Sequence, residues 1–173
     1  LNNNLLAEEL SPSISVLESE ICKWFSEKIG FKDNSGGIGA SGGTLNNLNA
    51  LVTARFCSGM TYDPEAAFIV SEDAHLSFRK CGRIIGLKEE NIISIDTDNY
   101  GRMKITSLMK EIENRGKSCK NIFAVIATHG TTVRGAIDPI AEISKICLDK
   151  NIWLHVDASI GGVFSLAKNK IIE

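Results

Sequence analysis

The stretch NIFAVIAT, residues 121–128, decides the fold class of this chain. It is short, apolar and rich in β-branched residues, which is typical of a β-strand covered on both faces. Three other stretches share this character, namely AAFIVS at 66–71, NIISID at 91–96 and NIWLHVD at 151–157. Helical patterns separate them, so we expect an α/β fold with a mostly parallel sheet in a three-layer αβα arrangement.

The helices are expected from apolar residues that recur on one face. Ser11-Pro12 is a good helix opening, and the glycine-rich stretch before residue 45 precedes a second helix that ends near Arg55. Two more helices are expected, one around 105–112 and one that begins at Asp138-Pro139. The residues expected on the apolar faces of the four helices are Ile14, Leu17, Ile21, Trp24 and Phe25; Leu48, Leu51 and Val52; Ile105, Leu108, Met109 and Ile112; and Ile140, Ile143, Ile146 and Cys147.

Length and composition limit the possible functions. The chain has 173 residues and a formal net charge of -2, and its like charges are not gathered into runs that would indicate a nucleic-acid or membrane partner. Its five cysteines are scattered and never form C-x-x-C, which favours reduced thiols in the core over disulfides or a metal site. We therefore expect one soluble, cytoplasmic domain that binds neither nucleic acid, nor membrane, nor metal.

The glycine-rich stretch GIGASGGT, residues 37–44, contains the pattern G-x-G-x-x-G. A dinucleotide-binding site needs a strand that runs directly into this loop and an acidic residue about twenty positions later. The preceding strand is missing and Glu72 and Asp73 come too late, so an oxidoreductase of the Rossmann type is disfavoured. The loop still opens a helix, where backbone N–H groups around Gly43 and Thr44 can bind a phosphate. The alternative is a glycine turn that only caps the helix.

Asp157 ends an otherwise apolar strand and is followed by Ser159. A buried carboxylate needs a cationic partner, and the carboxyl ends of parallel strands are where α/β proteins bind ligands. Pyridoxal phosphate carries both a phosphate for a helix N-terminus and a pyridine nitrogen whose protonated form an aspartate can hold. For Asp157 taken alone, a helix cap or a structural ion pair is the alternative.

Five segments in order resemble the group II pyridoxal-phosphate-dependent amino-acid decarboxylases, which include aromatic-amino-acid, glutamate and diaminobutyrate decarboxylases. The resemblance implies the fold of the large domain of fold-type I pyridoxal-phosphate-dependent transferases. It runs through nearly the whole chain, in the segments SPSISVLESEICKWF (11–25), ASGGTLNNLNALVTAR (40–55), SEDAHLSFRKCGRIIG (71–86), ATHGTTVRGAIDPI (127–140) and WLHVDASIGG (153–162).

The same resemblance implies the site residues. His75 and Asp157 are the expected catalytic residues, with His75 stacked on the pyridine ring and Asp157 paired with its nitrogen. Gly43 and Thr44 are expected to hold the phosphate. On the residues alone, a histidine between a strand and a helix is more often structural.

Further expectations concern the surroundings of the ring. The resemblance implies that Thr131 lies near it and that Ser159 lies on the face opposite the histidine. His155 precedes Asp157 by two residues, so we expect both on the same face of the strand, with His155 as a partner of the carboxylate. His129 is given no cofactor contact.

What the resemblance implies about activity is the decarboxylation of an L-amino acid to an amine by a homodimer. Aromatic, acidic and diamino substrates all stay open. The family's cofactor-binding lysine lies well beyond the position of Asp157, past Glu173, and Lys168 and Lys170 come too soon. We therefore expect residues 1–173 to be part of a large cofactor-binding domain, without the N-terminal segment, the later strands and the C-terminal small domain, and to be inactive alone. The alternatives are a non-catalytic remnant that binds a partner, or a pyridoxal-phosphate lyase or aldolase of the same fold.

Overall fold

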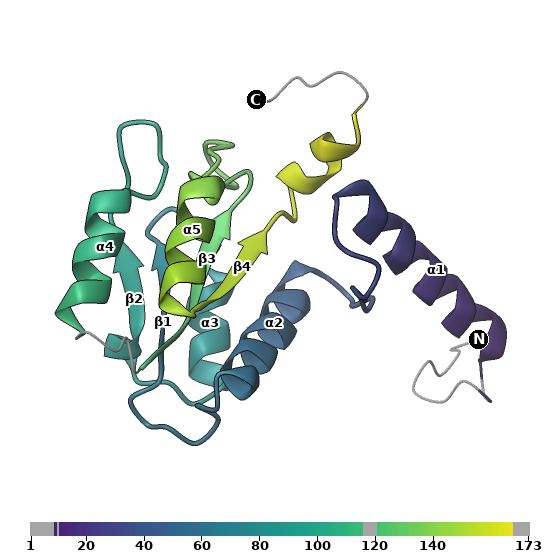
Figure 1. The fold of residues 1–173 in the computed structure, drawn as a ribbon, viewed down its shortest axis with the longest axis horizontal. Coiled ribbons are helices and arrows are strands. Elements are labelled where there is room, and N and C mark those ends of the chain that lie inside the picture. Colours follow the sequence, from purple (N-terminus) through teal and green to yellow (C-terminus); the bar gives the residue numbers. More distant parts are fainter. Residues whose placement is uncertain (1–8, 10, 116–120, 168–173) are drawn as a thin grey trace. The chain divides into compact units, whose positions relative to one another are not determined.

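The computed structural model describes residues 9, 11–115 and 121–167 of the chain (Figure 1). It divides into two compact units, of which one runs from Gly42 to Val163 and the other joins the segment before Gly42 to the segment from Phe164. None of the helices in the described residues is both long and apolar enough to span a membrane.

The larger unit is built on a four-stranded parallel sheet in the order β2-β1-β3-β4. In the central pair Ile69 lies beside Val125, and at the carboxyl end of the sheet Thr128 lies beside Asp157. All four strands predicted from the sequence are confirmed. They are β1 (Ala67–Ser71), β2 (Ile92–Ile95), β3 (Ile122–Thr128) and β4 (Trp153–Asp157).

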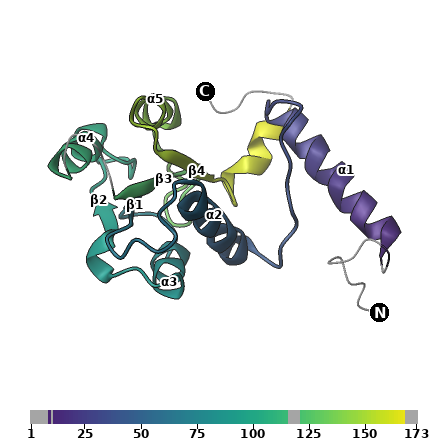
Figure 2. The ribbon, with the colours of Figure 1, turned by 60° about the horizontal axis from the view of Figure 1, so that its bottom comes forward.

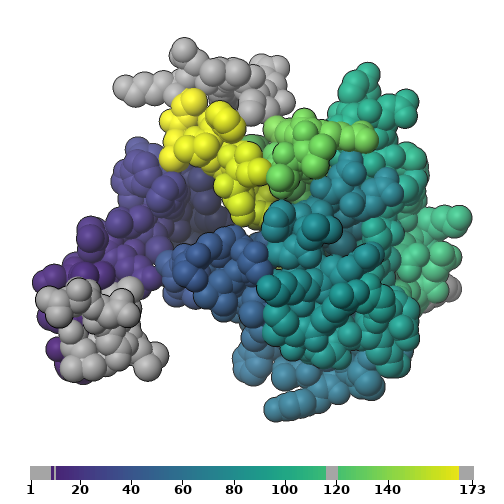
Figure 3. Space-filling view, turned by 180° about the vertical axis from the view of Figure 1, so that it is seen from behind, coloured from purple at the N-terminus to yellow at the C-terminus, as the bar shows by residue number. Residues whose placement is uncertain are grey.

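Two pairs of helices cover the two faces of the sheet (Figure 2). On one face α2 (Gly43–Cys57) and α3 (Ser77–Ile84) lie side by side, as the space-filling view also shows (Figure 3). The other face is covered by α4 (Ile105–Asn114) and α5 (Ile140–Lys150). The expected three-layer αβα arrangement is therefore confirmed.

Alternation along the strands divides the apolar core into two clusters, because successive side chains point to opposite faces of a sheet. In β1, Ile69 packs on the α4 and α5 side, whereas Phe68 packs on the α2 and α3 side. The ring of Phe68 meets that of Phe123 edge to face, at 5.9 Å between centroids. Every residue of β1 and β3 is buried, which explains the continuous apolar runs in the sequence.

The helix α2 differs in detail from its expected pattern. Val52 is half exposed, and the buried residues of the helix are Asn47, Leu51 and Ala54. Arg55 does more than complement a helix dipole, because its guanidinium donates to the carbonyl groups of three loop residues. These acceptors are Met60, Asp63 and Ile85, at 2.7 to 2.9 Å.

The smaller unit contains α1 (Pro12–Lys28), with Ser11 at its N-cap as expected. The glycines that begin the G-x-G-x-x-G pattern pack on this helix. A Cβ atom at Gly37 would lie 3.0 Å from Cβ of Cys22, and the N–H of Gly39 donates to Glu18 at 2.7 Å. No strand lies between α1 and α2 in the described residues, so these glycines serve close packing and the dinucleotide interpretation fails.

Two 3-10 helices complete the described elements. They are η2 (Glu89–Asn91) and η3 (Gly161–Leu166).

Candidate functional site

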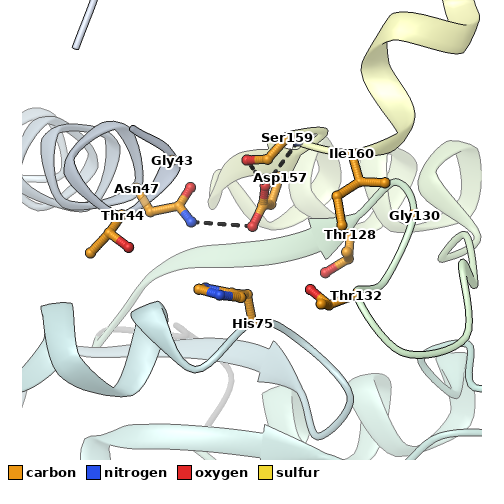
Figure 4. Close-up of a pocket in the computed structure, with 10 residues that line it drawn as sticks. All are labelled: Gly43, Thr44, Asn47, His75, Thr128, Gly130, Thr132, Asp157, Ser159 and Ile160. Carbon is orange, nitrogen blue, oxygen red and sulfur yellow. Dashed lines mark hydrogen bonds between the residues drawn. The ribbon is translucent and has the colours of Figure 1, made fainter. Parts of the chain in front are cut away.

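A cavity of about 310 Å³ lies at the carboxyl end of the sheet, within the larger unit (Figure 4). The carboxyl ends of parallel strands are the usual ligand-binding edge of an open α/β sheet. The N-terminus of α2, the turn after β1 and the loops after β3 and β4 all contribute to its wall. The lining residues are Gly43, Thr44, Asn47, His75, Thr128, Gly130, Thr132, Asp157, Ser159 and Ile160.

Asp157 ends β4, and only 7% of its surface is exposed. Its Oδ1 accepts hydrogen bonds from the backbone N–H of Ser159 at 3.1 Å and from the Ser159 hydroxyl at 2.6 Å. Its Oδ2 accepts from Nδ2 of Asn47 at 3.1 Å. Within the described part of the chain no lysine or arginine forms an ion pair with it. The alternative of a structural ion pair therefore has no support in the described residues. The Asp157 carboxylate faces the cavity, where it can bind a cationic ligand.

His75 lies in the turn between β1 and α3, on the opposite side of the cavity from Ser159 (Figure 4). The backbone N–H of Ser77 donates to Nδ1 of the imidazole at 3.2 Å, and Oγ of Ser77 lies 2.8 Å from the same nitrogen. These two bonds hold one edge of the ring. Its flat face can then line the cavity on the side expected for a stacking residue.

The N-terminal turn of α2 supplies backbone N–H groups to the cavity wall. Gly42 caps the helix with a φ of 146°, a backbone conformation that suits glycine. Gly43 and Thr44 follow in the first turn, where N–H groups have no partner within the helix. Both residues line the cavity, so their location agrees with an anion-binding role.

The loop after β3 places Thr132 on the cavity, whereas Thr131 is not among the lining residues. Thr131 is buried, and its Oγ1 accepts the N–H of Ala136 at 3.0 Å, which closes the turn. This geometry gives no support to the expected contact of Thr131 with a cofactor ring. The Thr131 hydroxyl is bonded to Ala136, and it is Thr132 that lines the cavity. The buried hydroxyl of Thr128 also lines the cavity and has no hydrogen-bond partner among the described residues.

His155 contacts the carboxylate only indirectly. Its Nε2 lies 3.0 Å from Oδ1 of Asn47, and its ring meets Phe78 edge to face at 5.9 Å. Burial lowers the pKa of His155, although the nearby Asp157 carboxylate acts in the opposite direction. The expected partnership therefore runs through Asn47.

Sequence reasoning missed Asn47, Thr128, Gly130, Thr132 and Ile160 as lining residues. Helical spacing could have found Asn47, because it precedes the buried Leu51 by four residues and so lies on the same face of α2. A polar residue on a buried helix face needs a partner, and here it has three. The remaining four lie in loops or at a strand end, where no periodicity identifies them.

Comparison with known proteins matches this arrangement to one family. Residues 1–170 match the family model described as "Pyridoxal-dependent decarboxylase conserved domain". Acidic amino acid decarboxylase GADL1 of Homo sapiens is 36% identical over 169 residues, which are 94% of this chain and 32% of the relative. Aromatic-L-amino-acid decarboxylase of Bacillus atrophaeus is 34% identical over 145 residues, or 84% of this chain and 30% of the relative. The chain spans about a third of the length of these curated relatives.

Solved structures agree with the sequence matches. Mouse CSAD in its apo form has a TM-score of 0.87 at 31% identity, covering 96% of this chain and 36% of the CSAD chain. The second is the glutamate decarboxylase domain of diaminobutyrate-pyruvate transaminase and L-2,4-diaminobutyrate decarboxylase from Vibrio parahaemolyticus. It has a TM-score of 0.88 at 26% identity, covering 98% of this chain and 39% of that chain. The fold is that of the fold-type I enzymes.

Proposed function

Because the chain belongs to the pyridoxal-dependent decarboxylase family, we propose that the natural gene product removes the α-carboxyl group of an L-amino acid as carbon dioxide and releases an amine. The cofactor of the family is pyridoxal 5'-phosphate. One observation carries the proposal, namely that a buried carboxylate with no cationic partner among the described residues faces the same cavity as a helix N-terminus and an imidazole.

The cavity fits the charges of the cofactor. Asp157 can accept a hydrogen bond from a protonated pyridine nitrogen, and the first turn of α2 at Gly43 and Thr44 can bind a phosphate. The orphaned hydroxyl of Thr128 and the exposed hydroxyl of Thr132 offer further polar contacts on the same wall. The cavity therefore offers an anionic group for the pyridine nitrogen, N–H donors for the phosphate, and the Thr128 hydroxyl, which has no partner among the described residues.

When bound, pyridoxal phosphate supplies an aromatic ring that accepts the electron pair left as the α-carboxylate departs. The carboxylate of Asp157, whose two oxygens are oriented by Ser159 and Asn47, would stabilise positive charge on the pyridine nitrogen. His75 and Ser159 lie on opposite sides of the cavity (Figure 4), so His75 would limit the tilt of a bound ring from one side and Ser159 from the other. We propose Thr132 in place of Thr131 as the threonine of the loop after β3 that faces the ligand.

The proposed function also requires a lysine, whose side-chain amine binds the cofactor covalently. No lysine lies among the residues that line the cavity in the described part of the chain, and Lys168 and Lys170 lie outside the described residues. We propose that a lysine from beyond these 173 residues completes the site and that the chain is inactive without it. The side chain of the amino-acid substrate stays open, since the relatives are named for acidic and for aromatic substrates.

The test uses the natural gene product, which is incubated with pyridoxal phosphate, reduced with borohydride and weighed intact. We expect a cofactor-labelled lysine, and carbon dioxide release from at least one acidic, aromatic or diamino acid. Asp157→Ala should lose most of this release, whereas Asp149→Ala, at an exposed position, should retain it. A labelled protein that releases no carbon dioxide would indicate a lyase or aldolase instead. An unlabelled protein would reject the function and favour a non-catalytic binding role.

Assembly is a separate part of the proposal. Membership in the family supports a homodimer, and light scattering on the natural gene product measures its mass directly. A monomer that is fully active would contradict it. The cytoplasmic location stays a prediction from the scattered cysteines.

A further inference from the structure

Asn47, which lies on α2, hydrogen-bonds to residues of α3 and β4, and these bonds bear on the proposed function. The side chain is buried, with 3% of the residue surface exposed. Its Nδ2 donates to Oδ2 of Asp157 on β4 and to Oγ of Ser77 on α3, each at 3.1 Å. Its Oδ1 lies 3.0 Å from Nε2 of His155. Every polar atom of the amide thus has a partner.

The chemistry of these partners determines how the amide is oriented. A carboxylate only accepts hydrogen bonds, so the NH₂ group of Asn47 must face Asp157. Its carbonyl oxygen then faces His155, whose Nε2 must carry a proton in order to donate. Burial lowers the pKa of His155, which favours the neutral ring, and the contact with Asn47 then assigns its proton to Nε2. If the amide flipped, its carbonyl oxygen would face Oδ2 of Asp157, and two hydrogen-bond acceptors would then oppose each other.

Ser77 extends the connection to His75. The backbone N–H of Ser77 can only donate, so Nδ1 of His75 is an acceptor. Oγ of Ser77 accepts from Asn47, so its own proton is free to donate to the same Nδ1 at 2.8 Å. In the neutral imidazole the proton is therefore at Nε2. The direction of donation is uniform, from His155 through Asn47 and Ser77 to His75.

We propose that Asn47 is a positioning residue that, together with Ser77, holds Asp157 and His75 in one arrangement and keeps the proton of His75 on Nε2. The proposal rests on the proposed function, because Asp157 and His75 are the residues that would hold the cofactor. Without the amide, Oδ2 of Asp157 and Oγ of Ser77 both lose a donor. The carboxylate of Asp157 is then held through Oδ1 alone, by Ser159. The Ser77 hydroxyl is no longer oriented by Asn47, so the Nε2-protonated form of His75 is favoured less strongly, by the backbone N–H of Ser77.

The test compares wild type with Asn47→Ala, Ser77→Ala and the control Asn46→Ala in the natural gene product. Asn46 directly precedes Asn47 on α2 and is exposed. Two quantities are measured on cofactor-free protein: the dissociation constant for added pyridoxal phosphate, and the ¹⁵N chemical shifts of the His75 ring, assigned with His75→Gln. We expect Asn47→Ala to bind pyridoxal phosphate about tenfold or more weakly, as loss of a bond to a charged group implies. The His75 shifts should move from one tautomer toward a mixture, and Asn46→Ala should change neither quantity.

The outcomes separate the two claims. If wild type binds pyridoxal phosphate and Asn47→Ala keeps both its affinity and its His75 shifts, the positioning role is overturned and the proposed function survives. If wild type does not bind it, the proposed function is overturned, and the positioning role with it. Should Asn47→Ala fail to fold, Ser77→Ala decides, since it removes only a hydroxyl from the connection. Unchanged His75 shifts in that variant overturn the proposal.

Discussion

A Cβ atom added to Gly43 would lie 3.0 Å from Oγ of Ser159, which is closer than ordinary contact. The same hydroxyl donates to Oδ1 of Asp157 at 2.6 Å. A side chain at position 43 would therefore push on a group that orients the cavity's carboxylate. The first turn of α2 and the end of β4 are coupled at this one contact.

Gly43→Ala is expected to weaken the binding of pyridoxal phosphate, because Ser159 must move away from Asp157 to make room. The added methyl group would still be at an ordinary 3.6 Å from Cβ of Ser159 once the hydroxyl is gone. Ser159→Ala should therefore relieve part of the defect, and we expect the double variant to bind about threefold to tenfold more tightly than Gly43→Ala alone. Equilibrium titration of the cofactor-free natural gene product measures all four affinities. Strictly additive effects would show that the contact is not what limits binding.

Asp138 joins two segments through its carboxylate. Oδ1 accepts the N–H of Met103 and Oδ2 accepts the N–H of Thr128, both at 2.7 Å. Burial raises the pKa of this carboxyl, against the two N–H groups that lower it. Asp138→Ala leaves the backbone N–H groups of Met103 and Thr128 without their acceptor, so we expect a loss of about 1–3 kcal/mol in the free energy of unfolding. Urea unfolding checks this value.

The matched control for that variant is Asp149→Ala. The Asp149 side chain is 74% exposed and forms a surface pair with Lys150, an interaction of small net value. We expect a change within about 0.5 kcal/mol. Equal losses at both positions would contradict the assigned role of Asp138.

His155 predicts a dependence of stability on pH. Its pKa in the folded protein is lowered from the ordinary 6.5, chiefly by burial. As pH falls through 6.5 the unfolded chain binds a proton that the folded protein resists, so the free energy of unfolding falls until the folded pKa is reached. Above 6.5 the contribution is complete. We expect His155→Gln to flatten this acid-side slope in the cofactor-free natural gene product, measured by urea unfolding at several pH values. Equal slopes for variant and wild type below pH 6.5 would contradict this role of His155. Between pH 7.5 and 8.5 we expect the two proteins to have the same slope of unfolding free energy against pH.

The strands β1 and β3 were predictable because burial on both faces requires continuous apolar runs, whereas β2 and β4 have the same apolar character although Ser94 and Trp153 are exposed. Asp157 was predictable for the opposite reason, since a charge at the end of such a run conflicts with its surroundings. Gly43 and Thr44 followed from the chemistry of helix N-termini. These features depend on residues close together in the sequence.

Long-range pairing could not be predicted in the same way. Asp138-Pro139 indicates a local helix opening, yet the Asp138 carboxylate bonds to Met103 and Thr128 and makes no side-chain cap on α5. Thr131 and Thr132 are adjacent and chemically identical, so only the turn closed by Ala136 decides which hydroxyl reaches the cavity. The sequence contains the side chains of such pairs but not the loop geometry that selects between them.

The cysteines illustrate the same limit and yield a last prediction. Cys81 and Cys147 are buried as expected, but Cys57 at the end of α2 is exposed, and Cys119 lies outside the described residues. Burial raises the pKa of Cys147 to about 11, so at pH 8 only about one molecule in a thousand carries the reactive thiolate there. Iodoacetamide at pH 8 should therefore label Cys57 in the native natural gene product and leave Cys81 and Cys147 unlabelled, as peptide mass spectrometry can determine. Labelling in urea, where all of these thiols are accessible, is the control. If Cys147 reacts as fast as Cys57 without urea, α5 does not pack on the sheet as described, because that thiol is covered only while the helix stays in place.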